Sequence, residues 1–100
     1  MITYDHRVES VDRDDPELLS EQVAEIIRRQ IESGELGPRR KLPTQQAMVD
    51  LYDVSRGTVL RACEILTGEG LIRFVAGRGL YTVDAPAIAA WRKKRAKEKR

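Results

Sequence analysis

The sequence contains few of the residues that build metal sites, disulfides or membrane segments. Cys63 is its single cysteine, so no intrachain disulfide can form. His6 is its single histidine and has no neighbours at metal-ligand spacing. No apolar run approaches the roughly 18 residues of a membrane span, and the first residues lack the charged and apolar blocks of a signal peptide. We therefore expect a protein of the reducing cytoplasm without metal or membrane segment.

Catalytic patterns are lacking as well. The sequence shows no nucleophile placed with its base, no cluster of metal ligands and no glycine-rich phosphate loop with a lysine. We therefore expect neither an enzyme nor a cofactor-binding protein.

Length and composition indicate one globular domain, because the chain has 100 residues, of which 41% are hydrophobic and 34% charged. The net charge of +2 conceals an asymmetry. Residues 1–25 carry two basic and eight acidic side chains, whereas residues 92–100 carry seven basic and one acidic. The basic tail is the part that a polyanion would attract.

A first helix is indicated from about Glu17 to Ser33, and Gly34 is suited to a left-handed cap at its end. The apolar residues that recur at helical spacing are Leu19, Val23, Ile26, Ile27 and Ile31. Residues 1–16 mix charges with few apolar positions, so we expect them to form an N-terminal arm.

Two shorter helices should follow, with Thr44 and Ser55 as their N-caps and a turn of about three residues between them. The residues expected to be buried are Ala47, Met48, Leu51 and Tyr52 in the second helix, and Val59, Ala62, Cys63 and Leu66 in the third. Gly70 should end the third helix.

A β-hairpin is indicated by the β-rich runs Leu71–Val75 and Leu80–Val83, which flank the loop Ala76–Gly79. A very short strand is expected near Lys41–Leu42. Pro86 fits the first turn of a last helix. Three alternatives stay open for Ile88 and Trp91, which are packing on the first helix, a dimer contact, or no fixed structure.

This order of elements predicts a mainly α fold with a small β-hairpin, the winged helix-turn-helix, with a three-helix core plus a wing. We expect residues 1–16 to be the arm, 17–83 the DNA-binding domain, and 84–100 a short C-terminal helix and basic tail.

In such a fold, the start of the third helix reaches base edges in the major groove. Arg56 and Arg61 can donate to guanine or phosphate, Thr58 can meet a phosphate or a thymine methyl, and Gly57 permits close backbone approach. Arg78 in the glycine-rich wing loop is placed to enter a minor groove or meet the DNA backbone. The predicted DNA contacts are Thr44, Gln45, Gln46, Ser55, Arg56, Gly57, Thr58, Arg61, Gly77 and Arg78.

Two further basic clusters are candidates for phosphate contacts. They are Arg39, Arg40 and Lys41 before the second helix, and Arg92, Lys93, Lys94 and Arg95 in the tail. The alternative is a solvated loop in the first case and a disordered, solvated tail in the second. Cys63 is expected to be a buried structural thiol rather than a redox sensor.

The stretch from about Leu18 to Val83 resembles the DNA-binding domain of the GntR family of bacterial transcription regulators. The matching pieces are Gln22–Val23, Ile31–Pro38, Leu42–Thr44, Val54–Val59, Glu69–Ile72 and Gly77–Gly79. The resemblance implies operator binding as a symmetric homodimer on a palindromic site, with contacts from the positions of Thr44, Ser55, Arg56, Thr58 and Gly77.

The sequence departs from the family at Gln46 and Leu60, where the family usually or often has arginines that tend to face DNA. Family members also usually carry a C-terminal metabolite-binding domain, whereas only 17 residues follow Val83. We therefore expect no small-molecule effector.

The leading interpretation is sequence-specific binding of double-stranded DNA by a nucleoid-associated regulator, with repression as the expected outcome. One alternative is an accessory DNA-binding factor of a phage, plasmid or integrative element, acting in excision, transfer or copy control. Another is a winged-helix protein-interaction module, which Arg56, Arg61 and Arg78 disfavour.

Overall fold

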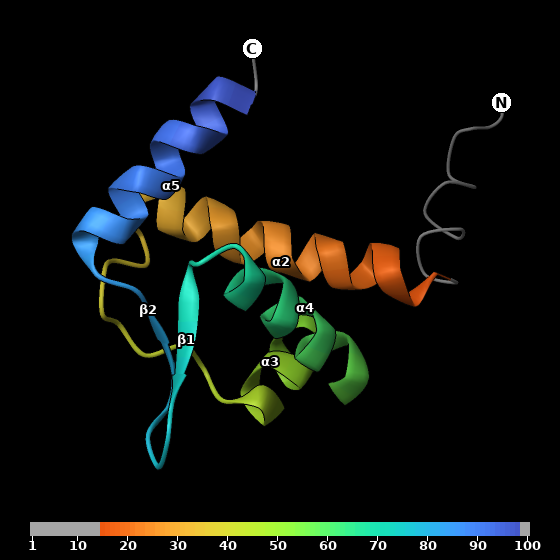
Figure 1. Cartoon of the computed structure of the whole chain (residues 1–100). Helices are drawn as coiled ribbons and strands as arrows, with labels where there is room; N and C mark the ends of the chain where they lie inside the picture. Colours follow the sequence, from red (N-terminus) through yellow and green to blue (C-terminus); the bar gives the residue numbers. More distant parts are fainter. Residues whose placement is uncertain (1–14, 99–100) are drawn as a thin grey trace, which may run out of the picture.

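The computed structural model describes residues 15–98, and Figure 1 shows how their helices and strands are arranged. Its elements are α2 (Pro16–Ser33), α3 (Gln45–Tyr52), α4 (Arg56–Gly68), β1 (Ile72–Val75), β2 (Gly79–Thr82) and α5 (Ala85–Glu98). This is the predicted order of helices and hairpin. The expected N-terminal arm lies outside the described residues except for its last two positions, as do Lys99 and Arg100 of the tail.

Local capping fixes the helix starts where the sequence predicted them. The Asp15 carboxylate accepts a hydrogen bond of 2.9 Å from the backbone N–H of Glu17 at the start of α2. The hydroxyls of Thr44 and Ser55 accept bonds of 3.0 and 3.2 Å from backbone N–H groups in the first turns of α3 and α4. Both predicted N-caps are confirmed, and together they fix a turn of three residues between α3 and α4.

The core lies between α2, α4 and the hairpin. Its buried apolar residues are Val23, Ala24, Ile27, Ile31, Leu42, Met48, Val59, Ala62, Cys63, Leu66, Leu71, Ile72 and Ile88. The predicted stripe of α4 is therefore confirmed in full. Because one continuous cluster joins every element, the starts of α3 and α4 are held rigidly against the same support.

Three of the apolar residues that helical spacing placed on one face of their helix are exposed. Ile26 is 41% exposed, because α2 turns a face centred on Val23 and Ile27 toward the core and Ile26 lies beside it. In the short helix α3, Met48 is buried and Tyr52 half-buried, one turn apart. Ala47 and Leu51, each one position earlier, therefore point to solvent.

A buried arginine joins α2 to the end of α4. The Arg28 guanidinium makes ion pairs with Glu21, Glu25 and Glu69, and its Nε donates to Glu69 at 2.8 Å. These hydrogen bonds, Glu69 first, raise the pKa of Arg28 further above its ordinary value despite desolvation. The carboxylates satisfy a charge that burial alone would strongly disfavour.

The wing hairpin pairs antiparallel, with Ile72 opposite Thr82 and Val75 opposite Gly79. The expected short strand is a single β-bridge between Lys41 and Tyr81. Next to it, the Leu42 N–H donates to the Leu80 carbonyl and the Thr82 N–H to the Arg40 carbonyl, each at 2.9 Å. These bonds place the loop that carries Arg39, Arg40 and Lys41 directly beside β2.

The basic tail is helical as far as Glu98. Ile88 is 3% exposed and Trp91 packs against the core, so both residues have a fixed place on the domain, which contradicts the third of the three alternatives. Arg92 donates to the carbonyls of Ile31 and Glu32 at the end of α2, at 2.9 and 3.2 Å. None of the helices in residues 15–98 has the length and apolarity that a membrane crossing needs.

Candidate nucleic-acid interface

The starts of α3 and α4 meet through Arg56. Its guanidinium nitrogens donate to the side-chain carbonyl oxygen of Gln45 at 3.2 Å and, more weakly, to that of Gln46 at 3.4 Å. The structure thus brings together three of the predicted contact residues, because Arg56 meets Gln45 and Gln46, which lie eleven and ten positions earlier in the chain. A guanidinium with only neutral partners keeps its charge available to an anion.

Backbone donors accompany these side chains. The first N–H groups of a helix have no acceptor within the helix, and the helix dipole makes that end favourable to anions. In α4 the Ser55 hydroxyl accepts a hydrogen bond from the Thr58 N–H. The N–H groups of Arg56 and Gly57 come before Thr58 in the first turn of the helix. The starts of α3 and α4 therefore each offer backbone donors to phosphate oxygens.

Thr58 does not lie as the sequence predicted. Thr58 is only 6% exposed, and its hydroxyl lies 3.1 Å from the Ser55 hydroxyl. The side chain thus lies at its own helix cap. Thr58 therefore has little surface to present to DNA and serves the cap instead.

Arg61 is also engaged within the protein. Its Nε and a terminal nitrogen donate to the two Glu17 oxygens at 3.0 and 3.1 Å, and it pairs with Glu64 at 3.2 Å. The hydrogen bonds that Arg61 donates to Glu17 and then to Glu64 raise the pKa of its exposed guanidinium. This contact ties the middle of α4 to the start of α2, so Arg61 can reach DNA only by leaving two carboxylates.

The wing loop forms a tight turn in which the Arg78 N–H donates to the Val75 carbonyl at 2.9 Å. Gly77 has φ of +77°, a backbone conformation that residues with a Cβ rarely adopt. The loop and the start of α3 both lie on the side of the molecule away from α5 (Figure 1). The wing is therefore a slender, exposed projection.

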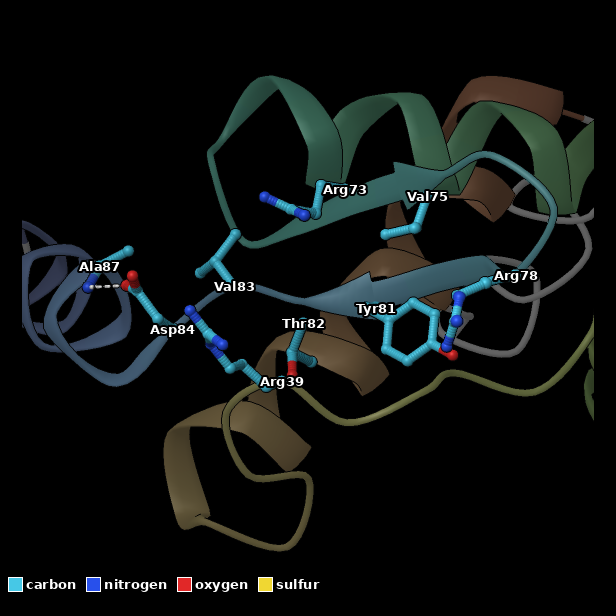
Figure 2. Close-up of a pocket in the computed structure, with 9 residues that line it drawn as sticks. All are labelled: Arg39, Arg73, Val75, Arg78, Tyr81, Thr82, Val83, Asp84 and Ala87. Atoms are coloured by element: carbon cyan, nitrogen blue, oxygen red, sulfur yellow. Dashed lines mark hydrogen bonds between the residues drawn. The ribbon is translucent and has the colours of Figure 1, made fainter.

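An open pocket of about 600 Å³ lies on the outer face of the wing, as Figure 2 shows. It is lined by Arg39, Arg73, Val75, Arg78, Tyr81, Thr82, Val83, Asp84 and Ala87. Arg73 and Tyr81 are cross-strand partners and share this face. The sequence-based prediction missed Arg73, although the alternation of β1 places it opposite the buried Ile72 and thus outward.

A second, larger groove of about 870 Å³ separates α4 from the inner side of the wing. Its lining includes Lys41, Gln45, Gln46, Arg56 and Arg78 from the predicted contacts, together with the apolar Leu60, Cys63, Phe74 and Leu80. Phe74 is 70% exposed and Leu60 41%. Cys63 is buried as predicted, and desolvation raises the pKa of its thiol.

The tail residues are divided between two roles. Arg92 caps α2, and Arg95 donates to Glu25 at 2.9 Å while its guanidinium lies 5.2 Å from the centroid of the Trp91 ring. Lys93 and Lys94 are exposed on α5. Two of the four predicted phosphate contacts in the tail are thus bound to the protein itself.

A division of charges follows from these contacts. We call the starts of α3 and α4, residues 39–41 and the wing hairpin the interface side. Within residues 15–98, no ion pair involves the basic residues of this side, which are Arg39, Arg40, Lys41, Arg56, Arg73 and Arg78. The interface side therefore carries basic side chains without ion-pair partners beside two exposed helix starts.

Solved structures with the same arrangement define the class as a winged helix-turn-helix DNA-binding domain. A GntR family transcriptional regulator from Listeria monocytogenes superposes with a TM-score of 0.73 over 80% of this chain and 71% of that one, at 23% identity. AraR(DBD) in complex with operator ORX1 superposes with a TM-score of 0.63 at 32% identity, over 65% of this chain and 78% of that one.

The family model described as bacterial regulatory proteins, gntR family, matches residues 19–82. The chain therefore belongs to the GntR family of bacterial regulatory proteins. The predicted fold and family are both confirmed.

Two curated relatives show similar sequences. The HTH-type transcriptional repressor NagR of Bacillus subtilis is 32% identical over 72 residues, which are 72% of this chain and 30% of NagR. The mannosyl-D-glycerate transport/metabolism system repressor MngR of Escherichia coli is 40% identical over 63 residues, which are 63% of this chain and 26% of MngR. The chain thus spans less than a third of either relative.

Proposed function

We propose that the interface side binds double-stranded DNA in a sequence-specific manner, with the start of α4 in the major groove and the wing loop at the neighbouring minor groove. The observation that carries this proposal is the set of basic side chains on the interface side that form no ion pair within residues 15–98. Arg56 then supplies direct readout of a guanine, and Arg39, Arg40, Lys41, Arg73 and Arg78 contact phosphates.

We further infer that binding represses transcription and that the DNA-bound form is a homodimer. Both relatives described above are named as repressors, which supports the first inference. A two-fold dimer on DNA implies two half-sites about one helical turn apart. The family membership supports a regulatory rather than an enzymatic role, and no observation favours the accessory-factor alternative.

The test begins with selection of bound sequences from a random duplex pool. Fluorescence anisotropy on a selected duplex then compares the wild type with Arg56→Ala. We expect a loss of about 1–3 kcal/mol and relaxed preference at one base pair, because a bidentate base contact is removed.

Arg29→Ala is the matched control, because Arg29 is 75% exposed in its side chain and pairs with Glu25 on α2, away from the interface side. Its affinity should equal that of the wild type. Equal losses in both variants would show that Arg56 contributes charge but no readout. Absence of binding to any duplex at low salt would overturn the proposed function.

A further inference from the structure

Leu60 is an exposed apolar residue in the groove between α4 and the wing, where cationic side chains also contribute to the lining. It lies on α4 one turn after Arg56, so both side chains project from the same face of the helix. Leu60 is 41% exposed, and it lines the groove between α4 and the wing together with Arg56. Whatever enters that groove beside Arg56 must also meet Leu60.

The rim of this groove indicates what its occupant is. Lys41, Arg56 and Arg78 line it without any carboxylate partner in residues 15–98, while Glu64, its acidic residue, is paired with Arg61. Such a rim complements a polyanion. An apolar protein segment would leave these charges desolvated and uncompensated, which is costly.

The floor of the groove adds a requirement that phosphates cannot meet. Leu60, Phe74 and Leu80 present carbon to the occupant. On the major-groove edge of duplex DNA, the one apolar group is the C5-methyl of thymine. Four residues along α4 correspond to a rise of about 6 Å, or roughly two base-pair steps, so with α4 along the groove Leu60 faces a base pair within about two steps of the one that Arg56 reaches.

We propose that Leu60 determines specificity at one base pair by packing on the 5-methyl group of a thymine. This inference rests on the proposed function, since it requires α4 to lie in the major groove. It names a readout residue and its ligand group, where the sequence analysis marked Leu60 only as a lost arginine.

The experiment uses the selected duplex with each thymine replaced, one at a time, by deoxyuridine, which differs by the loss of the methyl group. Wild-type protein should lose about fourfold in affinity at one position, the value expected for removal of one buried methyl. Leu60→Ala should bind the thymine and uracil duplexes equally, and Leu60→Met should retain the preference because its side chain is still apolar.

Leu51→Ala is the matched control, because Leu51 is 65% exposed on α3 and does not line the groove. This variant should discriminate between thymine and uracil as the wild type does. Since both leucines are exposed, neither alanine variant is expected to unfold, and circular dichroism verifies this.

Each outcome bears on a separate claim. If wild-type protein binds the selected duplex but no uracil replacement weakens it, the Leu60 inference is overturned and the proposed function stands. If a uracil effect persists in Leu60→Ala but vanishes in Phe74→Ala, the methyl is read from the wing and the assignment to Leu60 is wrong. If no duplex binds, the proposed function itself has failed.

Discussion

The arginines on the two sides of this molecule have different kinds of partner. On what we call the scaffold side, formed by α2, α5 and the body of α4, arginines bind carboxylates or backbone carbonyls of the protein. They are Arg28, Arg29, Arg61, Arg92 and Arg95. On the interface side, Arg56 bonds only neutral amides, and the other basic residues form no ion pair within residues 15–98.

The difference shows that net charge says little about where a polyanion binds. The overall charge is only +2, yet the acidic residues of α2 neutralise the scaffold arginines and leave the interface side positive. A paired arginine must first lose its carboxylate before it can neutralise a phosphate. An unpaired arginine exchanges only counterions and water, which is favourable at low salt.

The largest effect should follow from breaking the scaffold side at Arg28. Arg28→Ala removes a side chain that is 7% exposed and leaves Glu25 and Glu69 without their shared partner. We expect a loss of about 3 kcal/mol in the free energy of unfolding, measured by urea denaturation. Arg29→Ala, which removes an exposed partner of Glu25, should cost under about 1 kcal/mol. Equal losses would contradict the contrast between buried and exposed pairs.

A smaller effect, confined to binding, should follow from neutralising the outer face of the wing. Arg73→Ala and Arg78→Ala should each weaken binding to all duplexes alike and reduce the slope of log affinity against log salt by about 0.9. Anisotropy titrations at several salt concentrations give this slope. An unchanged slope in Arg73→Ala would remove the pocket of Figure 2 from the interface.

The variant Gly57→Ala tests whether the α4 backbone approaches DNA closely, because it should change affinity without harming the fold. A Cβ at Gly57 would meet only the Ser55 hydroxyl, at 3.9 Å, so the free protein has room for it. Helix propensity favours alanine by up to about 1 kcal/mol, so stability should be kept or slightly increased. Affinity for the selected duplex should fall if the α4 backbone approaches DNA closely. Thermal unfolding measures the stability and fluorescence anisotropy measures the affinity of the same sample. Retained affinity would argue against a close approach of the α4 backbone to DNA.

The acid side of the stability profile should report on Glu25. Burial alone would raise the pKa of this carboxyl, but the hydrogen bonds from Arg28 and Arg95 outweigh it, and the pKa is lowered from 4.5. The stabilisation is therefore present above about pH 4.5 and is lost as the pH falls through the folded-state value. Glu25→Gln should flatten the stability profile in that range. A profile identical to wild type would show that Glu25 does not contribute.

The smallest effect should come from the exposed lysines of α5. The double change Lys93→Ala and Lys94→Ala should leave the salt slope unchanged, because α5 lies on the side away from the wing loop (Figure 1). If the slope of log affinity against log salt fell by about two, the tail would contact phosphates, as its composition led us to expect.

Local patterns in the sequence were sufficient for much of this fold. Thr44 and Ser55 cap their helices as predicted because a cap depends on residues within three positions. The hairpin was equally predictable from its short β-rich runs and glycine-rich loop. Ile26 and Leu51 were misplaced because apolar spacing does not tell which of two adjacent apolar residues faces the core.

The roles of the interface residues could not be predicted from local sequence patterns, because they depend on partners that are distant in the chain. Arg61 was expected at DNA, yet its partner Glu17 lies 44 positions earlier in the chain. Thr58 has a suitable position for a base contact, but tertiary packing buries it. Leu60 acquires a role only when α4 and the wing form one groove. Which cations remain unpaired is thus a property of the folded molecule.

The central claim is that DNA meets the interface side and not the scaffold side. Nuclear magnetic resonance of ¹⁵N-labelled protein titrated with the selected duplex tests it residue by residue. The account predicts that the amide signals of Gln45, Arg56, Gly57 and Gly77 shift strongly while those of Glu25 and Glu32 stay in place. Strong shifts along α2 and α5, with the start of α4 unaffected, would contradict it.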